Sequence, residues 1–488
     1  MSQPKVHIKE IKGDNNLRTG LNTLLALVLF SAPILAVMIG QPYNLPGMFG
    51  VYQLGNEPYL IERATQAGIS SVVRQYRWEQ IEPEQNLFRF KVIDDWYNEV
   101  LEPNGLAGMI ILRTGQCWAT DNAYDSTLGE PLHELASAPP LDYDDYYNMV
   151  YHLVDHLKGR INVFVIENDP VTKYSWYGTP EEFIQLTAVA REAARAANHR
   201  CTLIGNKLPA MGFGYLITRD LVEEGLIDEA VEFWNGYYSR RDESFQVSSP
   251  GQLMNWLDSD FGLWVVNFAN TIMMRDQAEN LDAMGFNYYL HYDYIEQVVG
   301  WMYDRMEENG YYRPLLDLEH GVKDEREILS DMTAAEELIK GYTIIQSLGI
   351  RQVSWYPFAI DSLSHNYEYL KPMYLLETGE LLPPYYAMRT FAEHFDFYNY
   401  CSGRYGDDYS RYSFENIEKG HVDLDIVWAD SLEITVAIPY PPGTNLALIT
   451  SHTGELLDSI PNITDTLMIS VDKSPRLIKW KNSGLWCQ

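Results

Sequence analysis

The stretch NVFVIENDP, residues 162–170, decides the fold because it has the pattern of one strand of a parallel sheet followed directly by polar residues. Apolar side chains fill residues 163–166, as in a strand that is buried on both faces. Three polar residues, 167–169, follow before a proline ends the run. A helix start comes next, with Thr179 as the N-cap, proline at the first helical position and Glu182 three residues after the cap. The segment is therefore predicted to be a βα unit.

Seven further apolar runs alternate with segments of helical periodicity and bring the number of candidate strands to eight. Such alternation is typical of βα units around a parallel sheet, and eight units are what a (β/α)8 barrel, or TIM barrel, requires. We therefore predict an α/β fold with a barrel over residues 41–400. The other runs are MFGVYQ from residue 48, SVVRQY from 71, GMIILRT from 108, TLIG from 202, DAMGFNYY from 282, PLLDLEH from 314 and RQVSWYPF from 351.

Two parts of the chain depart from this alternation. Residues 209–280 are too many for one βα connection, so we expect an inserted lobe or extra helices there. Within them EAVEFWNGYY, residues 229–238, is a second candidate for the sixth strand. From residue 401 to residue 488, β-like segments lie between Pro, Gly and Asp turns and predict a small C-terminal β domain. Cys401 and Cys487 in that domain are candidates for a disulfide bond.

Composition narrows the classes of function. The 488 residues contain 36 Lys and Arg against 68 Asp and Glu, a formal charge of −32, and no basic run that would follow a nucleic acid backbone. The 35 Tyr, 12 Trp and 17 Phe residues supply flat surfaces that suit sugars, although a large core uses them too. No CxxC, P-loop, GxSxG, HExxH or post-strand GxGxxG motif is present, so no metal or cofactor is indicated. The oligomeric state stays open.

An uncharged apolar segment lies near the N-terminus. Residues 21–40 have about the length of a membrane-spanning helix, and residues 1–20 before them carry four Lys and Arg residues. Because no further Lys or Arg occurs until Arg63, the positive-inside rule predicts a cytoplasmic tail and an extracytoplasmic body. We favour a retained transmembrane anchor because no clean cleavage site follows the apolar run, whereas cleavage would give a secreted protein.

Carboxylates stand at the ends of two predicted strands, where a barrel carries its reactive residues. Asp169 comes shortly after residues 163–166, and Glu319 lies near the end of the run that begins at residue 314. Glycoside hydrolysis needs such a pair: a protonated acid serves the leaving oxygen, and a carboxylate attacks the sugar or activates water. Asp169 and Glu319 are therefore the candidate catalytic residues, and Asp169 must have a raised pKa to act as the acid.

A family resemblance supports this assignment. The stretch VRQYRWEQIEPE, residues 73–84, with Phe88 and Ile93-Asp94 after it, resembles the second-strand segment of the retaining clan A glycoside hydrolases. This clan includes β-galactosidases, β-xylosidases and cellulase-type enzymes, and the similarity covers roughly residues 48–395. In the clan the fourth strand ends in Asn-Glu-Pro, whose Glu is the acid/base, and the seventh strand ends in the nucleophilic Glu.

The resemblance implies a carbohydrate ligand and assigns further roles. Glu319 corresponds to the nucleophile, and Asn168 to the amide that holds the 2-hydroxyl of the sugar. The other implied binding residues are Arg74, which orients the nucleophile, Asn287 and Tyr289, which lie near it, and Trp355, which forms an aromatic platform under the sugar. Core packing is the alternative role for Trp355 and Tyr289.

One departure from the clan affects the predicted chemistry, because the acid/base position holds Asp169 in place of Glu. Its side chain is one methylene shorter, and a misplacement of about 1 Å costs on the order of 100-fold in rate. Three alternatives stay open: a retaining hydrolase, an inverting one with water in the wider gap, or an inactive barrel that serves as a glycan-binding or structural subunit at the membrane surface. Carboxyl separations of about 5–5.5 Å favour retention and about 6.5–9.5 Å favour inversion.

Overall fold

The computed structural model describes the chain from Met48 to Lys481, apart from several internal segments. The described ranges are 48–121, 136–173, 175–274, 279–350, 352–361, 369–395, 398–405, 408–416, 421–430, 433–462 and 466–481. Among these residues no helix has the length and apolar character needed to cross a membrane. The predicted span, residues 21–40, lies outside them.

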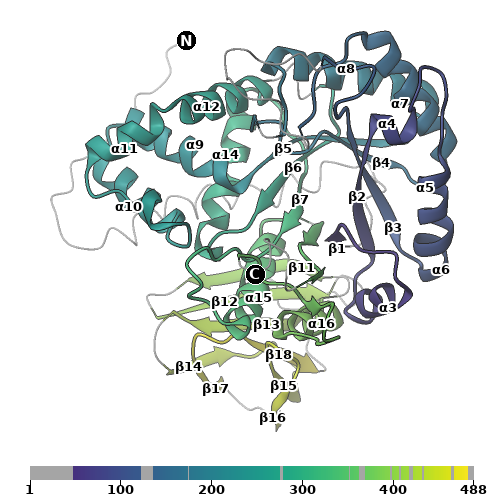
Figure 1. The fold of residues 1–488 in the computed structure, drawn as a ribbon. Coiled ribbons are helices and arrows are strands. Elements are labelled where there is room, and N and C mark those ends of the chain that lie inside the picture. The colour runs from purple at the N-terminus through teal and green to yellow at the C-terminus, as the bar shows by residue number, and fades with distance from the viewer. Residues whose placement is uncertain are drawn as a thin grey trace, which may run out of the picture. The chain divides into compact units, whose positions relative to one another are not determined.

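Eight parallel strands close into a barrel in chain order, and β1 pairs with β8 to complete the ring. Figure 1 labels strands β1 to β7 of this barrel. All eight predicted strands are present, which confirms the predicted barrel. The strands are β1 (Phe49–Tyr52), β2 (Ser71–Arg77), β3 (Ala107–Arg113), β4 (Val163–Ile166), β5 (Thr202–Leu208), β6 (Ala283–Tyr288), β7 (Leu315–His320) and β8 (Val353–Trp355).

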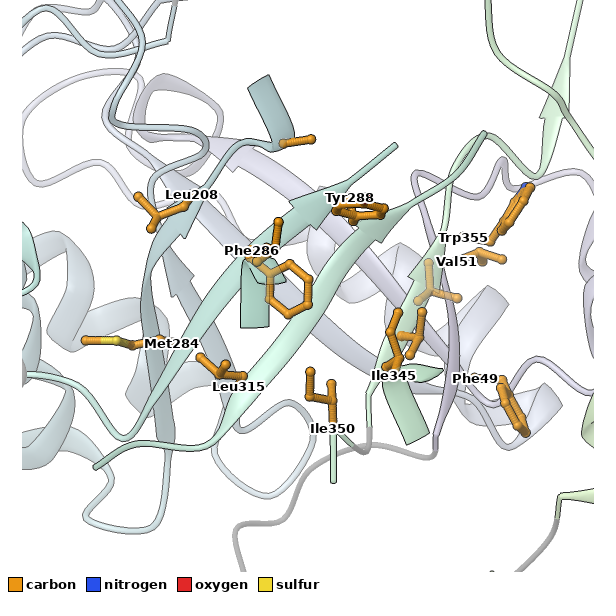
Figure 2. Close-up of a cluster of buried hydrophobic side chains, with 14 of the residues drawn as sticks. Phe49, Val51, Leu208, Met284, Phe286, Tyr288, Leu315, Ile345, Ile350 and Trp355 are labelled. Carbon is orange, nitrogen blue, oxygen red and sulfur yellow. The ribbon is translucent and has the colours of Figure 1, made fainter. Parts of the chain in front are cut away.

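Alternate residues of the strands fill two separate layers. One set, which includes Val73, Ile111 and Val165, fills the inside of the barrel. The other set packs outward with side chains of the helices, as the ring of Phe286 on β6 does with that of Phe213 on α9 (Ala210–Glu223); Figure 2 draws Phe286 together with Leu315 on β7. This division follows from the two-residue period of a strand, and it determines which side chains can reach the mouth of the barrel.

Helices follow the strands and cover the outer layer (Figure 1). The predicted N-cap is present at α8, where the Thr179 side chain accepts from the Glu182 backbone N–H and the Glu182 carboxylate accepts from the Thr179 backbone N–H. The main helices around the barrel are α3 (Pro58–Gln66), α5 (Lys91–Trp96), α7 (Tyr143–Leu157), α8 (Pro180–Ala197), α14 (Ile295–Glu308), α15 (Asp331–Ser347) and α16 (Pro383–His394).

The long connection between β5 and β6 holds additional helices. The alternative that residues 229–238 form the sixth strand is wrong, because they lie largely in a helix. Its buried side chains, Ala230, Trp234 and Tyr237, recur at three- and four-residue spacing, which is the period of a helix face. The helices are α9 (Ala210–Glu223), α10 (Ile227–Tyr237), α11 (Pro250–Leu257) and α12 (Asp260–Ile272).

The C-terminal region forms antiparallel sheets with a core of its own. Its side chains also join the barrel core, since the ring of Phe395, after α16, meets the ring of Phe414 at 4.5 Å. Cys401 is in a disulfide bond, whereas its predicted partner Cys487 lies outside the described residues. One sheet runs β11 (Tyr398–Tyr405), β12 (Tyr409–Asn416), β13 (His421–Ala429), β18 (Arg476–Lys481), β15 (Leu446–Ser451) and β16 (Leu456–Pro461), and a second pairs β14 (Ile434–Pro439) with β17 (Thr466–Val471).

Candidate active site

The chain turns sharply after β4 and presents Asp169 at the mouth of the barrel. Glu167 and Asp169 have left-handed φ values of 60° and 49°, which are uncommon for residues other than glycine and concentrate at functional sites. Two amides hold the Asp169 carboxylate: Asn168 Nδ2 donates to its Oδ2 at 3.1 Å, and Asn287 Nδ2 from β6 donates to its Oδ1 at 2.6 Å. The structure thus brings together Asn168, Asp169 and Asn287, three of the residues predicted for the site.

Glu167 cannot take over the role of Asp169. Its side chain is fully buried, and its Oε1 accepts from the Thr114 backbone N–H at 2.5 Å. Its other oxygen lies 3.6 Å from Arg113 Nε at the end of β3. Burial raises the pKa of this carboxyl. Glu167 therefore joins β4 to β3 beneath the site and does not face solvent.

A β-bulge aims Glu319 into the mouth. The register between β6 and β7 shifts by one residue at Leu318, so β7 carries an extra residue there. Leu318 belongs to the barrel interior, whereas His320 packs outward against Trp355. Because a bulge re-aims the side chains around it, Glu319 points into the mouth, where it contacts β5 and the end of β6.

Lys207 on β5 lies between the two candidate catalytic carboxylates. Its ammonium donates to Glu319 Oε2 at 2.6 Å and to Asn168 Oδ1, and it lies 4.0 Å from Asp169 Oδ1. It also lies 4.9 Å from the ring centre of Tyr52 on β1. The register of β5 shifts before Leu208 as well, and this irregularity turns Lys207 inward.

Both carboxylates remain open to solvent, although the lysine between them is not. The Glu319 side chain is 12% exposed, that of Asp169 is 20% exposed, and that of Lys207 is 0% exposed. Tyr289 donates its hydroxyl to Glu319 Oε1, so each oxygen of Glu319 accepts a hydrogen bond. A ligand in the mouth can therefore reach both carboxylates while Lys207 stays behind them.

The Asp169 carboxyl has a pKa raised to about 6. Burial is the largest cause, and the negative charge of Glu319 raises the pKa further. The cations of Lys207 and Arg113 and the hydrogen bond from Asn287 act in the opposite direction. Asp169 is thus able to hold a proton at a mildly acidic pH, as a general acid must.

The two carboxylates lie within a short distance of each other. Lys207 Nζ is 4.0 Å from Asp169 Oδ1 and 2.6 Å from Glu319 Oε2, and these distances together set an upper limit of about 6.6 Å between the two oxygens. Retaining glycosidases have carboxyl separations of about 5–5.5 Å and inverting ones about 6.5–9.5 Å. The limit concerns one oxygen of each carboxyl, so the two groups lie close enough to act on one glycosidic bond, and the separation of the carboxyl groups fits either range.

Comparison with solved structures identifies the same fold in several glycoside hydrolases, although no family model and no curated protein sequence matches the chain. A family 39 glycoside hydrolase from Bacteroides cellulosilyticus has a TM-score of 0.60 and 13% identity over 89% of this chain and 81% of its own. A glucosidase from Croceicoccus marinus has a TM-score of 0.57 and 12% identity over 90% and 97%. A β-xylosidase from Caulobacter crescentus has a TM-score of 0.53 and 9% identity over 89% and 96%.

The chain has the fold of these glycoside hydrolases. At such low sequence identity the likeness covers the arrangement of strands and helices alone. The role of each residue depends on its own position and contacts in this fold.

Arg74 does not lie at the mouth, which corrects the role that the resemblance implied for it. Its neighbour on β2, Val73, points into the barrel, so alternation turns Arg74 outward. There its guanidinium lies 5.6 Å from the ring centre of Trp96 on α5. The cation that contacts Glu319 is Lys207.

Trp355 is also in the outer layer and cannot serve as a sugar platform. The side chain is fully buried, and its ring lies 5.9 Å from that of His320 and 6.3 Å from that of Tyr342 on α15. Figure 2 shows it beside Val51 among the buried apolar side chains. Its position fits core packing, because alternation along β8 turns Trp355 away from the barrel interior.

Three aromatic and basic side chains of the site escaped sequence reasoning. Tyr356, directly after β8, packs edge to face on Tyr52 at 5.3 Å between ring centres. The pKa of each of these phenols is raised by burial and by the charge of Glu319. Because side chains along a strand alternate in direction, an outward Trp355 would have indicated that Tyr356 points inward. Lys207 could not be predicted in this way because the apolar run of its strand ends at Gly205.

The donor set of the site does not suit a metal ion. Across the described residues, no group of three His, Cys, Asp or Glu side chains has the geometry to hold one. Lys207 occupies the position between the two carboxylates at which a cation would bind. The arrangement instead provides a protonatable carboxyl, a fixed carboxylate and hydrogen-bonding amides.

Proposed function

We propose that this chain is a retaining glycoside hydrolase that cleaves β-linked sugars, with Asp169 as the general acid/base and Glu319 as the nucleophile. The observation that carries the proposal is the pair of solvent-accessible carboxylates at the mouth of the barrel. One oxygen of each lies no more than about 6.6 Å from one oxygen of the other, and one of the two carboxyls is able to hold a proton. The likeness to solved glycoside hydrolases supports it.

The proposed reaction has two steps. In the first, Asp169 gives its proton to the glycosidic oxygen while Glu319 attacks the anomeric carbon, so that the glycosidic bond breaks and a glycosyl ester forms on Glu319. In the second, Asp169 takes a proton from water, and the water oxygen displaces Glu319 from the anomeric carbon. Asp169 regains its proton and Glu319 is released as a carboxylate, so both residues return to their starting states.

The contacts of Glu319 suit the nucleophile. Lys207 and Tyr289 each donate to one of its two oxygens, which fixes the direction of the carboxylate. Asn168 and Asn287 hold Asp169 in turn, so each carboxyl is positioned by neighbours on other strands or on the adjacent residue. Such positioning is the part of catalysis that a rigid barrel supplies best.

Turnover of aryl β-glycosides tests the proposal. The full-length protein is assayed with aryl β-glycosides of glucose, galactose, xylose and mannose, alongside Glu319→Gln and Asp169→Asn. We expect hydrolysis of at least one substrate and its loss in Glu319→Gln. Asp282→Asn is the matched control, because Asp282 pairs with Arg195 just before β6, at the opposite end of the barrel. Hydrolysis that persists in Glu319→Gln would contradict the assignment.

A non-catalytic glycan-binding barrel is the second candidate function. Two observations favour it: the acid/base position holds Asp169 in place of Glu, and Lys207 already neutralises part of the charge of the pair. In that case the same sugars bind to the full-length protein in calorimetry and are not cleaved. Binding without turnover of any glycoside would therefore replace the first proposal with this one.

We also propose that the barrel lies on the extracytoplasmic side of a membrane, attached through residues 21–40. The charge distribution around this segment supports the proposal. Membranes that carry the full-length protein should retain it after extraction at alkaline pH, and external protease should digest the barrel. A barrel protected from external protease would contradict this orientation.

A further inference from the structure

Lys207 is a fully buried cation with carboxylates on two sides. Its Nζ lies 2.6 Å from Glu319 Oε2 and 4.0 Å from Asp169 Oδ1, and it donates to Asn168 Oδ1 as well. An ammonium group has three donors and no acceptor. Because its contacts are with protein groups and no part of it reaches solvent, Lys207 acts through its neighbours and does not bind the sugar.

The two distances are unequal, and this inequality has a chemical consequence. A cation stabilises the ionised form of a nearby carboxyl, and the effect grows as the separation falls. Lys207 therefore stabilises the charge of Glu319 more strongly than that of Asp169. Its hydrogen bond to Asn168 Oδ1 also fixes the amide so that Nδ2 faces Asp169.

We propose that Lys207 is the positioning residue that distributes the proton between the two carboxyls, keeping Glu319 as the anion and leaving Asp169 to carry the proton. The inference rests on the proposed hydrolase function and deepens it. Lys207 thereby does, from β5, what the sequence resemblance implied for Arg74 on β2.

Other charged and titratable groups also face the pair, so the role of Lys207 has to be separated from theirs. Arg113 on β3 acts on Asp169, but its Nε lies 3.6 Å from Glu167 and its Nη2 donates to the Ser175 carbonyl. Among the described residues, the other titratable groups near the pair are the phenols of Tyr52 on β1, Tyr289 after β6 and Tyr356 after β8, and burial raises the pKa of all three. They stay neutral across the working pH range, which leaves Lys207 as the cation that contacts Glu319.

The pH profile of kcat/KM tests the proposal in the full-length protein. In Lys207→Met the Asp169 carboxyl loses a stabilising cation, so its pKa rises, and we expect the basic limb of the profile to move to higher pH by about one unit or more. Lys207→Arg keeps the charge and should restore the position of this limb. A merely structural role would lower the rate at every pH and leave the limbs in place, and that result would overturn the proposal.

A matched control is available at Lys340 on α15. This lysine is also buried, and its ammonium lies 4.8 Å from the ring centre of Tyr292, outside the site. Lys340→Met therefore removes a buried cation without touching the carboxylate pair, and the limbs should not move. If Lys207→Met does not fold, Lys207→Gln takes its place, since it removes the charge and keeps a donor for Asn168.

A second readout does not depend on turnover. The ionisation of Asp169 is followed by infrared difference spectroscopy between the full-length protein and Asp169→Asn over a range of pH. Lys207→Met should shift this titration upward, and an unchanged titration would overturn the proposal. A wild-type chain that cleaves no glycoside would overturn the hydrolase function alone, and the titration would still decide the role of Lys207.

Discussion

Asp169 lies where the resemblance to clan A glycoside hydrolases leads us to expect a glutamate, and its side chain is one methylene shorter than a glutamate's. The local backbone accommodates the difference, because left-handed residues at 167 and 169 turn the chain. Both oxygens of Asp169 then reach the amides of Asn168 and Asn287. The hydrogen bonds from these two amides therefore fix the position of the shorter side chain.

The pKa of Asp169 predicts the basic limb of the pH profile. A general acid must carry its proton, and the pKa of this carboxyl is raised to about 6. We expect kcat/KM to fall as pH rises through about 6, with one proton lost. Initial rates on an aryl β-glycoside between mildly acidic and alkaline pH measure the limb. A profile that stays flat across this range would show that Asp169 is not the acid.

Lengthening this side chain tests whether the site is built around Asp. Asp169→Glu restores the residue type of the clan but pushes the carboxyl past Asn168 and Asn287, so we expect kcat to drop by about 10-fold or more. Steady-state kinetics on the best aryl glycoside measure the effect. An increase in kcat would mean that the natural Asp is a defect and would favour the glycan-binding alternative.

At the scale of strands, two irregularities create the site. A perfect two-residue alternation carries no information about where an extra residue lies, so the shifts in β5 and β7 were not predictable from apolar runs. The runs themselves were sufficient to locate all eight strands, and the ends of β4 and β7 indicated Asp169 and Glu319. Lys207 was missed because it follows the apolar run of its strand, and Arg74 was misplaced because the resemblance assigned its role without regard to the alternation along β2.

Gly321 keeps the end of β7 close to β8. A Cβ atom there would meet the Tyr356 carbonyl oxygen and would lie 3.0 Å from the ring of Tyr289, which donates to Glu319. We expect Gly321→Ala to lower kcat by about 10-fold or more through displacement of Tyr289, and to destabilise the fold by about 1–3 kcal/mol. Gly251→Ala is the control, since a Cβ there meets open space. Wild-type kinetics in Gly321→Ala would contradict this account.

At the scale of the whole molecule, the C-terminal sheets share the barrel core. Phe414 on β12 is fully buried, and its ring lies 4.5 Å from that of Phe395 and 5.9 Å from that of Tyr400. On the side of α15, the Ser474 hydroxyl donates to Glu336 at 2.5 Å. Both contacts tie the sheets to the helices that cover the barrel.

This shared core predicts cooperative unfolding. Phe414→Ala leaves a cavity where the two parts meet, so the free energy of unfolding should fall by about 3–5 kcal/mol. Calorimetry should show one transition at a lower Tm, whereas Met468→Ala, at an exposed position of β17, should leave the Tm unchanged. Two separate transitions, with the barrel at its original Tm, would contradict the shared core.

Trapping the glycosyl ester tests the central claim most directly. The full-length protein is incubated with an activated aryl β-glycoside that carries fluorine in place of the 2-hydroxyl, which slows breakdown of the ester, and intact mass spectrometry measures any adduct. We predict one added sugar per chain, located on the peptide that contains Glu319 and absent in Glu319→Gln. Substrate cleavage with no adduct, or an adduct on another residue, would contradict the retaining mechanism with Glu319 as the nucleophile.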